Sequence, residues 1–237
     1  MAHMRDNSSV LAAAERRLLI GIARNLPAFV TSDQLSALAL VSMLGAAAAF
    51  AFISISAWFA ALFVVFLLLN WFGDSLDGTV ARVRNQQRPR YGYYVDHVID
   101  LAGTAALING MALSDVMTPS IGFALLAAYF LVAAETFLAT HSVGIFRISF
   151  AGFGPTELRI LLAAGAIKVA TSPTVELMGR QLRLLDVGGV VAIAGLSVAF
   201  VVSAIRTGAA LYRAEPLPVR ENAQRPTSRV ALWSAGS

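Results

Sequence analysis

Cysteine is absent from this 237-residue chain, lysine occurs once, and charged residues make up only 14% of the sequence. Without cysteine the chain forms neither disulfides nor thiolate metal sites. A soluble globular domain carries about 25% charged residues, so the deficit excludes an ordinary water-soluble surface. What the chain has instead is apolar: 57% of its residues are hydrophobic, and the mean hydropathy is +0.70. The lipid bilayer is therefore the expected solvent.

Long apolar runs recur along the chain, and a transmembrane helix needs about 20 such residues. They predict an all-α polytopic membrane protein with six transmembrane helices, near residues 34–53, 57–83, 92–114, 119–140, 156–171 and 187–210. Residues 8–29 mix apolar and charged side chains at helical spacing, which predicts an N-terminal amphipathic helix lying in the membrane interface. Ser32 or Asp33 is expected to cap the first span.

These elements divide the chain into three parts. Residues 1–33 form an N-terminal tail and the interfacial helix, residues 34–212 the six-helix transmembrane catalytic domain, and residues 213–237 a polar tail that we expect to be disordered.

Arginine is concentrated before the first span, between the second and third, between the fourth and fifth, and after the sixth. On the opposite side only Arg180 and Arg183 are clear. The positive-inside rule then places both termini in the cytoplasm. The pI near 10 is explained by this topology, so we expect membrane lipids and no nucleic acid as partners.

Four aspartates lie at the cytoplasmic ends of the second and third predicted spans: Asp74, Asp77, Asp96 and Asp100. Carboxylates at membrane depth are costly and mark functional sites. At about 100° per residue, the first pair shares one helix face, and the second pair, four residues apart, shares another. If the two faces pack together, the four carboxylates converge.

Four converging anions raise one another's pKa values until some protonate, unless cations compensate them. Carboxylate oxygens suit Mg²⁺ or Mn²⁺, and two such ions would bridge a pyrophosphate and neutralise the leaving group. The faces also carry small residues, Gly78, Ala81 and Gly92, which leave a hollow for a nucleotide. Arg82 offers a planar fork for phosphate oxygens. Asn70, one turn before Asp74, would either touch the nucleotide or bond a neighbouring helix.

The spacing D-x-x-D-G-x-x-A-R followed by G-x-x-x-D-x-x-x-D resembles the signature of the CDP-alcohol phosphotransferase family, also called CDP-alcohol phosphatidyltransferases. The residues that match it are Asp74, Asp77, Gly78, Ala81, Arg82, Gly92, Asp96 and Asp100. The resemblance implies a metal-dependent transferase of phospholipid biosynthesis that passes a substituted phosphate group from a CDP-linked donor to an alcohol and releases CMP. It also implies a homodimer with six membrane helices and an interfacial N-terminal helix.

Carried over by position, the resemblance makes Asp74, Asp77 and Asp96 metal ligands. Asp100 would complete the metal site or act as the general base towards the acceptor hydroxyl. By the same resemblance Gly78, Ala81 and Arg82 contact the cytidine diphosphate moiety. One departure concerns Asp33, which stands where the family usually has an asparagine near the nucleotide.

His97 follows Asp96, and this Asp-His pair resembles the choline/ethanolamine branch of the family, where the histidine is a candidate proton acceptor. A neutral imidazole near pH 7 suits general-base work. On a helix, however, His97 points about 100° away from Asp96, so the alternative is a residue at the edge of the site.

An acceptor pocket is expected to include Glu157 and Arg159, at the start of the fifth span, and Arg147, between the fourth and fifth spans. These arginines would bind an anionic acceptor, which favours CDP-diacylglycerol as donor with a small polar alcohol as acceptor. His97 favours the alternative, a CDP-aminoalcohol donor with diacylglycerol as acceptor. The alternative from another class of function is a cation- or proton-coupled transporter that uses intramembrane carboxylates.

Overall fold

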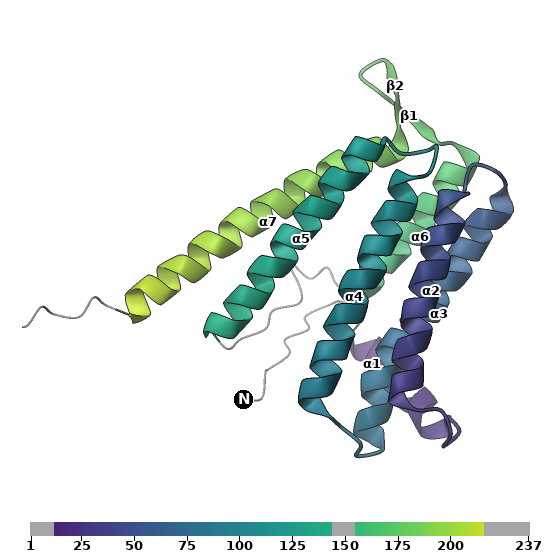
Figure 1. Cartoon of the computed structure of the whole chain (residues 1–237). Coiled ribbons are helices and arrows are strands. Elements are labelled where there is room, and N and C mark those ends of the chain that lie inside the picture. The colour runs from purple at the N-terminus through teal and green to yellow at the C-terminus, as the bar shows by residue number, and fades with distance from the viewer. Residues whose placement is uncertain (1–11, 144–154, 216–237) are drawn as a thin grey trace, which may run out of the picture.

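The computed structural model describes residues 12–143 and 155–215, and this part of the chain is almost entirely helical. The elements are α1 (Ala12–Asn25), α2 (Ser32–Ala51), α3 (Ala57–Val83), α4 (Pro89–Ala112), α5 (Pro119–Val143), α6 (Pro155–Thr171), β1 (Thr174–Leu177), β2 (Arg180–Arg183) and α7 (Leu184–Ala214). α2 packs against α3 and α4, and α6 packs against α3. Figure 1 shows α1 near one end of these helices and the β1–β2 hairpin at the other.

Helices α2 to α7 match the six predicted spans to within a few residues at most of their ends. By length and composition, α2, α3, α5 and α7 are the described helices that are long and apolar enough to cross a membrane. The mostly helical fold, with four helices that could cross a membrane among the described residues, is therefore confirmed, whereas the count of six spans stays a prediction. The predicted C-terminal tail lies mostly outside the described residues.

The helix starts follow from local side-chain chemistry. Thr31, not Ser32 or Asp33, caps α2: its hydroxyl accepts from the Gln34 amide at 3.2 Å, while its own amide donates to the Gln34 side chain at 2.9 Å. This capping box satisfies two amides that a helix start leaves unpaired. At α3 the cap is a single bond: the Ser56 hydroxyl accepts from the Trp58 amide. Prolines begin α4, α5 and α6, because a first-turn residue needs no amide hydrogen.

Glycine brings α2 close to both of its neighbours. A Cβ added at Gly73 of α3 would lie 2.6 Å from the Leu35 carbonyl oxygen, and one added at Gly110 of α4 would lie 2.3 Å from the Ala47 carbonyl oxygen. No real side chain fits at such distances. The first of these approaches lies beside Asp74, so it sets the distance between α2 and the aspartates of α3.

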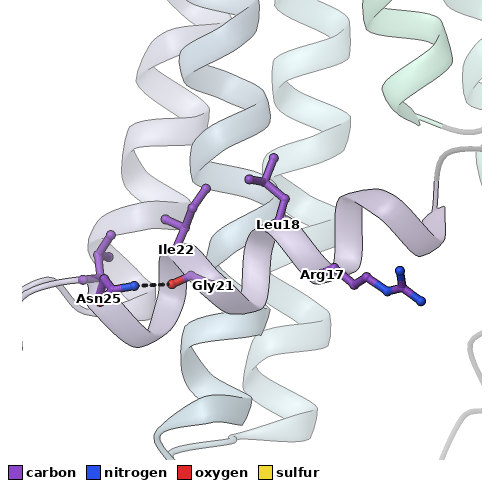
Figure 2. Close-up of a pocket in the computed structure, with 6 residues that line it drawn as sticks. Arg17, Leu18, Gly21, Ile22 and Asn25 are labelled. Atoms are coloured by element: carbon purple, nitrogen blue, oxygen red, sulfur yellow. Dashed lines mark hydrogen bonds between the residues drawn. The ribbon is translucent and has the colours of Figure 1, made fainter.

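α1 packs one face against α3 and the beginning of α2. Leu19 and Ala23 are buried there with Leu35, Leu76 and Val80. An open, largely apolar depression lies along α1 and includes Ile22 and Leu26, which pack against the same buried cluster. Figure 2 shows its lining residues on α1, which runs across the rest of the bundle. The lining residues are Arg17, Leu18, Gly21, Ile22, Asn25 and Leu26. An exposed face of this composition is compatible with the predicted interfacial position, which stays a prediction.

α5 and α7 pack against each other, and most of their apolar surface is exposed in the single chain. Asp186 in the first turn of α7 accepts from the Thr118 amide at 2.7 Å and from the Thr118 hydroxyl at 2.6 Å. The carboxylate therefore ties the starts of both helices together at the end that carries the hairpin. The hairpin turns at Met178 and Gly179, which both have positive φ (51° and 74°).

Candidate active site

Three of the four predicted aspartates converge at the end of the bundle where α3 ends and α4 begins. One carboxylate oxygen from each of Asp74, Asp96 and Asp100 lies within 4.8 Å of the other two. Asp74 comes from α3 and the other two from α4. These two helices are joined by a short loop and both pack on α2, so the group depends on how α2 holds them together. This is the convergence that the two helix faces predicted.

Asp77 faces the same cavity but is engaged elsewhere. The Ser36 hydroxyl of α2 donates to its Oδ2 at 2.5 Å, and the Gly78 amide donates to its Oδ1 at 2.5 Å. The Ser32 hydroxyl also donates to the Asp77 backbone carbonyl at 3.0 Å. α2 therefore orients this aspartate, which is why Asp77 stands apart from the other three.

Arg159 of α6 lies against the aspartate cluster. Its Nη2 donates to Asp74 Oδ2 at 2.6 Å, and its Nε donates to Asn70 Oδ1 at 2.9 Å. The amide nitrogen of Asn70 in turn donates to the Ala39 carbonyl of α2 at 3.0 Å. A chain of hydrogen bonds thus runs from α6 through α3 to α2. For Asn70, the bond to a neighbouring helix that the sequence left open is the one observed.

A cavity of about 280 Å³ opens beside the cluster. Its lining includes eight of the predicted site residues: Asp74, Asp77, Gly78, Ala81, Arg82, Gly92, Asp96 and His97. Asp100 and Asn70 are not among the lining residues. Arg82 donates to the Thr79 hydroxyl at 2.9 Å. A Cβ added at Gly92 would meet no atom within 4 Å, so the backbone there is open to a ligand.

His97 lies at the edge of this cavity, on the side of α5. Its Nδ1 is 2.7 Å from the Tyr93 carbonyl oxygen, and its ring packs against the rings of Tyr93 and Phe137, with centroids 4.1 and 5.5 Å away. Its Nδ1 is 3.8 Å from Asp96 Oδ2. A bond from Nδ1–H to the carbonyl fixes the tautomer in which Nε2 is the proton-accepting nitrogen.

Two arginines at the α3–α4 loop have partners that the sequence did not reveal. The Arg84 guanidinium donates to the backbone carbonyls of Val30, Leu26 and Pro27 at 2.6, 2.9 and 3.0 Å. Arg88 pairs with Asp33 at the mouth of the cavity and stacks on the Tyr91 ring at 4.1 Å. The hydrogen bond that Arg88 donates to the Asp33 carboxylate raises the pKa of the Arg88 guanidinium above its ordinary value.

The predicted acceptor pocket is only partly described. Glu157 and Arg159 are half-buried at the start of α6, and Arg159 is bonded to the aspartate cluster as given above. Arg147 lies outside the described residues. That these three side chains bind the acceptor stays a prediction.

The donor set fits a divalent cation. Three carboxylates offer oxygen ligands within one small volume, with Asp77 adjacent, and hard oxygen ligands of this kind are those that Mg²⁺ and Mn²⁺ prefer. Arg159 leaves Asp74 Oδ1 for an ion, because its own bond is to Oδ2.

Two comparisons with known proteins bear on this site. The sequence model of the family described as CDP-alcohol phosphatidyltransferase matches residues 29–202, a range that contains all four aspartates. A crystal structure of Mycobacterium tuberculosis phosphatidylinositol phosphate synthase with CDP-DAG bound is similar in fold, with a TM-score of 0.55 and 20% sequence identity, over 83% of this chain and 94% of that one. At that identity the likeness concerns the fold alone. A search of curated protein sequences finds no match.

Proposed function

Since the chain belongs to the CDP-alcohol phosphatidyltransferases, integral membrane enzymes that transfer substituted phosphate groups, we propose that it moves a phosphatidyl group from CDP-diacylglycerol to a small polar alcohol and releases CMP. The observation that carries this proposal is the cluster of Asp74, Asp96 and Asp100 beside a cavity lined by Arg82. Carboxylates and a guanidinium around one hollow suit a metal-bridged pyrophosphate. We do not propose the transporter alternative, because the family is one of transferases.

In this proposal Asp74, Asp77 and Asp96 hold two divalent cations, Mg²⁺ or Mn²⁺, and Asp100 completes the cluster or takes the proton. When bound, the ions supply charge neutralisation at the pyrophosphate. The chain's own groups do the rest. Arg82 binds phosphate oxygens through its fork, and Gly78, Ala81 and Gly92 let the nucleotide approach the helix backbones.

The reaction is a direct displacement at the β-phosphorus of the donor. The acceptor oxygen forms the new bond to phosphorus, the bond to the bridging oxygen breaks, and CMP leaves. The hydroxyl proton passes to the Asp100 carboxylate, which is the most exposed of the three clustered aspartates. His97 Nε2 is the alternative acceptor, at the edge of the cavity.

Two observations support CDP-diacylglycerol as the donor. The crystal structure of the similar synthase has CDP-DAG bound, and Arg159 beside Asp74 gives this site a cation that an anionic acceptor would meet. His97 supports the alternative, a CDP-aminoalcohol with diacylglycerol as acceptor. We also propose six membrane-crossing helices, α2 to α7, an interfacial α1, cytoplasmic termini and active site, and the homodimer that the family implies.

The test is CMP release by the protein purified in detergent with Mg²⁺ or Mn²⁺. CDP-diacylglycerol is offered with a panel of polar alcohols, and CDP-choline and CDP-ethanolamine are offered with diacylglycerol. We expect metal-dependent CMP with CDP-diacylglycerol and one alcohol, and a particle with twice the mass of the chain. If CMP is released only from CDP-choline or CDP-ethanolamine, the donor is a CDP-aminoalcohol instead. If no pair releases CMP, the proposed reaction is wrong.

Asp77→Asn is the variant that tests the metal site. The amide oxygen of the new side chain can still accept from the Gly78 amide, and its nitrogen can donate to the Ser36 hydroxyl. The side chain no longer carries the negative charge, so we expect turnover to be lost, by a factor of at least about 100, with the fold intact. Asp115→Asn is the matched control, because Asp115 lies in the loop before α5 and bonds Ser54, at the other end of the bundle. An active Asp77→Asn enzyme would refute the assignment.

A further inference from the structure

Glu15 of α1 gathers hydrogen bonds from two other helices on a single carboxylate oxygen. Its Oε1 accepts from the Trp71 indole at 2.6 Å, from the Thr156 hydroxyl at 3.0 Å and from the Ser75 hydroxyl at 3.4 Å. Trp71 and Ser75 belong to α3, whereas Thr156 belongs to α6. Hydrogen bonds to an ionised acceptor are about twice as strong as neutral ones. Glu15 therefore links three helices at one point.

The two helices that Glu15 bonds, α3 and α6, each carry a residue of the candidate active site next to the residues that bond Glu15. Ser75 directly follows Asp74 and lines the same cavity. Thr156 precedes Arg159 by three residues, so the two side chains lie on one face of α6. Arg159 in turn donates to Asp74 at 2.6 Å. α3 and α6 are thus connected twice within about one helical turn, through Glu15 and through the Arg159–Asp74 pair.

The hydrogen bonds of Glu15 matter for the position of α6, which packs mainly on α3. At the start of α6, Thr156 and Arg159 are two of the polar links to other helices: Thr156 bonds Glu15 of α1, and Arg159 bonds Asp74 of α3. If the carboxylate at position 15 is removed, Thr156 loses its acceptor. α6 then has greater freedom to rotate or slide against α3, and Arg159 moves with it.

We propose that Glu15 is a positioning residue: α1 uses its carboxylate to hold α6 against α3, and this keeps Arg159 on Asp74 and Asp74 in the geometry that the metal site requires. The inference rests on the proposed function for the role of Asp74. On this proposal the metal site is intact only when α1 is packed in its place, because α1 supports the site through Glu15 without contacting it.

Two substitutions separate the acceptor role from the charge. Glu15→Gln keeps an oxygen that accepts from Trp71 and Thr156, whereas Glu15→Met has a similar length and no acceptor oxygen of that kind. For Glu15→Met we expect the Mn²⁺ concentration that gives half-maximal CMP release to rise about 10-fold, the usual effect of losing an outer partner of a metal ligand. The KM for an anionic alcohol acceptor should rise as well, because Arg159, which would meet that acceptor, moves with α6. Glu15→Gln should restore the parent value.

A second measurement needs neither metal nor substrate. Because the chain contains no cysteine, Leu68→Cys on α3 and Leu161→Cys on α6 introduce two unique attachment points for spin labels, and both positions are exposed. The distance distribution between the labels reports how α6 sits on α3. We expect it to broaden in Glu15→Met and to stay unchanged in Glu15→Gln. Glu176→Gln in β1, at the opposite end of the molecule, is the control and should change neither readout.

An unchanged distance distribution together with an unchanged Mn²⁺ requirement in Glu15→Met would overturn the proposal. So would a loss of thermal stability without any shift in the Mn²⁺ requirement, because that is the signature of a purely structural contact. If Glu15→Met does not fold in detergent, Thr156→Val decides, since it removes only the link to α6 and should change both readouts in the same direction. Failure of the proposed function is distinguishable: the parent enzyme would then release no CMP, while the label distances would still report on Glu15.

Discussion

At the scale of single residues, Arg84 and Arg159 are occupied by other groups of the protein. Arg84 donates to backbone carbonyls between α1 and α2, and Arg159 donates to a carboxylate and to a buried amide. Each arrangement uses several N–H groups of one planar fork, which lysine does not have. A sequence shows that an arginine is present, but its partners are decided by which helices pack against it.

Arg159→Lys tests how much the fork matters. An ammonium group can still pair with Asp74, but it cannot also reach Asn70 with the same geometry. The side-chain oxygen of Asn70 therefore loses its partner, and this residue is only 5% exposed. An unpaired buried acceptor costs about 1–3 kcal/mol. We expect a lower unfolding temperature, and a loss of turnover of about 10-fold because Asp74 is less well oriented. Thermal unfolding in detergent and CMP release measure the two effects.

Arg180→Lys is the matched control, since Arg180 is an exposed residue of the hairpin at the other end of the molecule. It should leave both stability and turnover as they are. An Arg159→Lys enzyme as stable and as active as the parent would show that the bond to Asn70 contributes nothing measurable.

At the scale of elements, the sequence predicts the helices well because their signal is local. The predicted spans 34–53 and 92–114 compare with α2 at Ser32–Ala51 and α4 at Pro89–Ala112, since a long apolar run determines a helix by itself. The β1–β2 hairpin escaped prediction. Its strands have four residues each, which is too few for an alternating pattern to stand out in the sequence.

The candidate site likewise has parts that the sequence predicts and parts that it does not. The convergence of Asp74, Asp96 and Asp100 was predictable, because spacing along two neighbouring helices places them on facing sides. The separate position of Asp77 was not, because it depends on Ser36 of α2. The role of Glu15 was not predictable either, since its partners are 56 to 141 residues away in the sequence and meet it only when three helices pack.

Gly73→Ala tests how tightly α2 must approach α3. The added Cβ would lie 2.6 Å from the Leu35 carbonyl oxygen and 2.8 Å from the Ala39 amide nitrogen, and backbone atoms cannot move aside as a flexible side chain does. Overpacking of this kind costs about 1–3 kcal/mol. We expect a lower unfolding temperature and reduced turnover, because Asp74 is the next residue. Both are measured on the protein in detergent.

Gly195→Ala in α7 is the control for the same chemical change. A Cβ at Gly195 meets no atom within 4 Å, and alanine is the better helix former by about 1 kcal/mol. Stability should therefore stay the same or rise. Equal behaviour of the two variants would mean that α2 and α3 do not need the close contact at Gly73.

At the scale of the whole molecule, the candidate active site lies at the end where α3 ends and α4 begins, and the β1–β2 hairpin lies at the other end (Figure 1). α4 connects the two ends: its first half carries Asp96 and Asp100, and the loop after it contacts Ser54 and Asp186. At about 1.5 Å per residue, its 24 residues have the length of a membrane span. α4 falls outside the four apolar candidates, and its first half is the part that carries the site.

Labelling of single cysteines with a membrane-impermeant maleimide tests the six-span topology in a chain that has no cysteine of its own. Gln86→Cys marks the α3–α4 loop, Leu113→Cys the α4–α5 loop and Met178→Cys the hairpin, where Met178 is 97% exposed. With six spans and the arginine-rich loops in the cytoplasm, positions 113 and 178 react in intact spheroplasts, and position 86 reacts only after permeabilisation. If only α2, α3, α5 and α7 crossed the membrane, position 113 would be protected together with position 86, while position 178 would still react. Leu113 is therefore the position that decides whether α4 spans the bilayer and carries its aspartates to the cytoplasmic side.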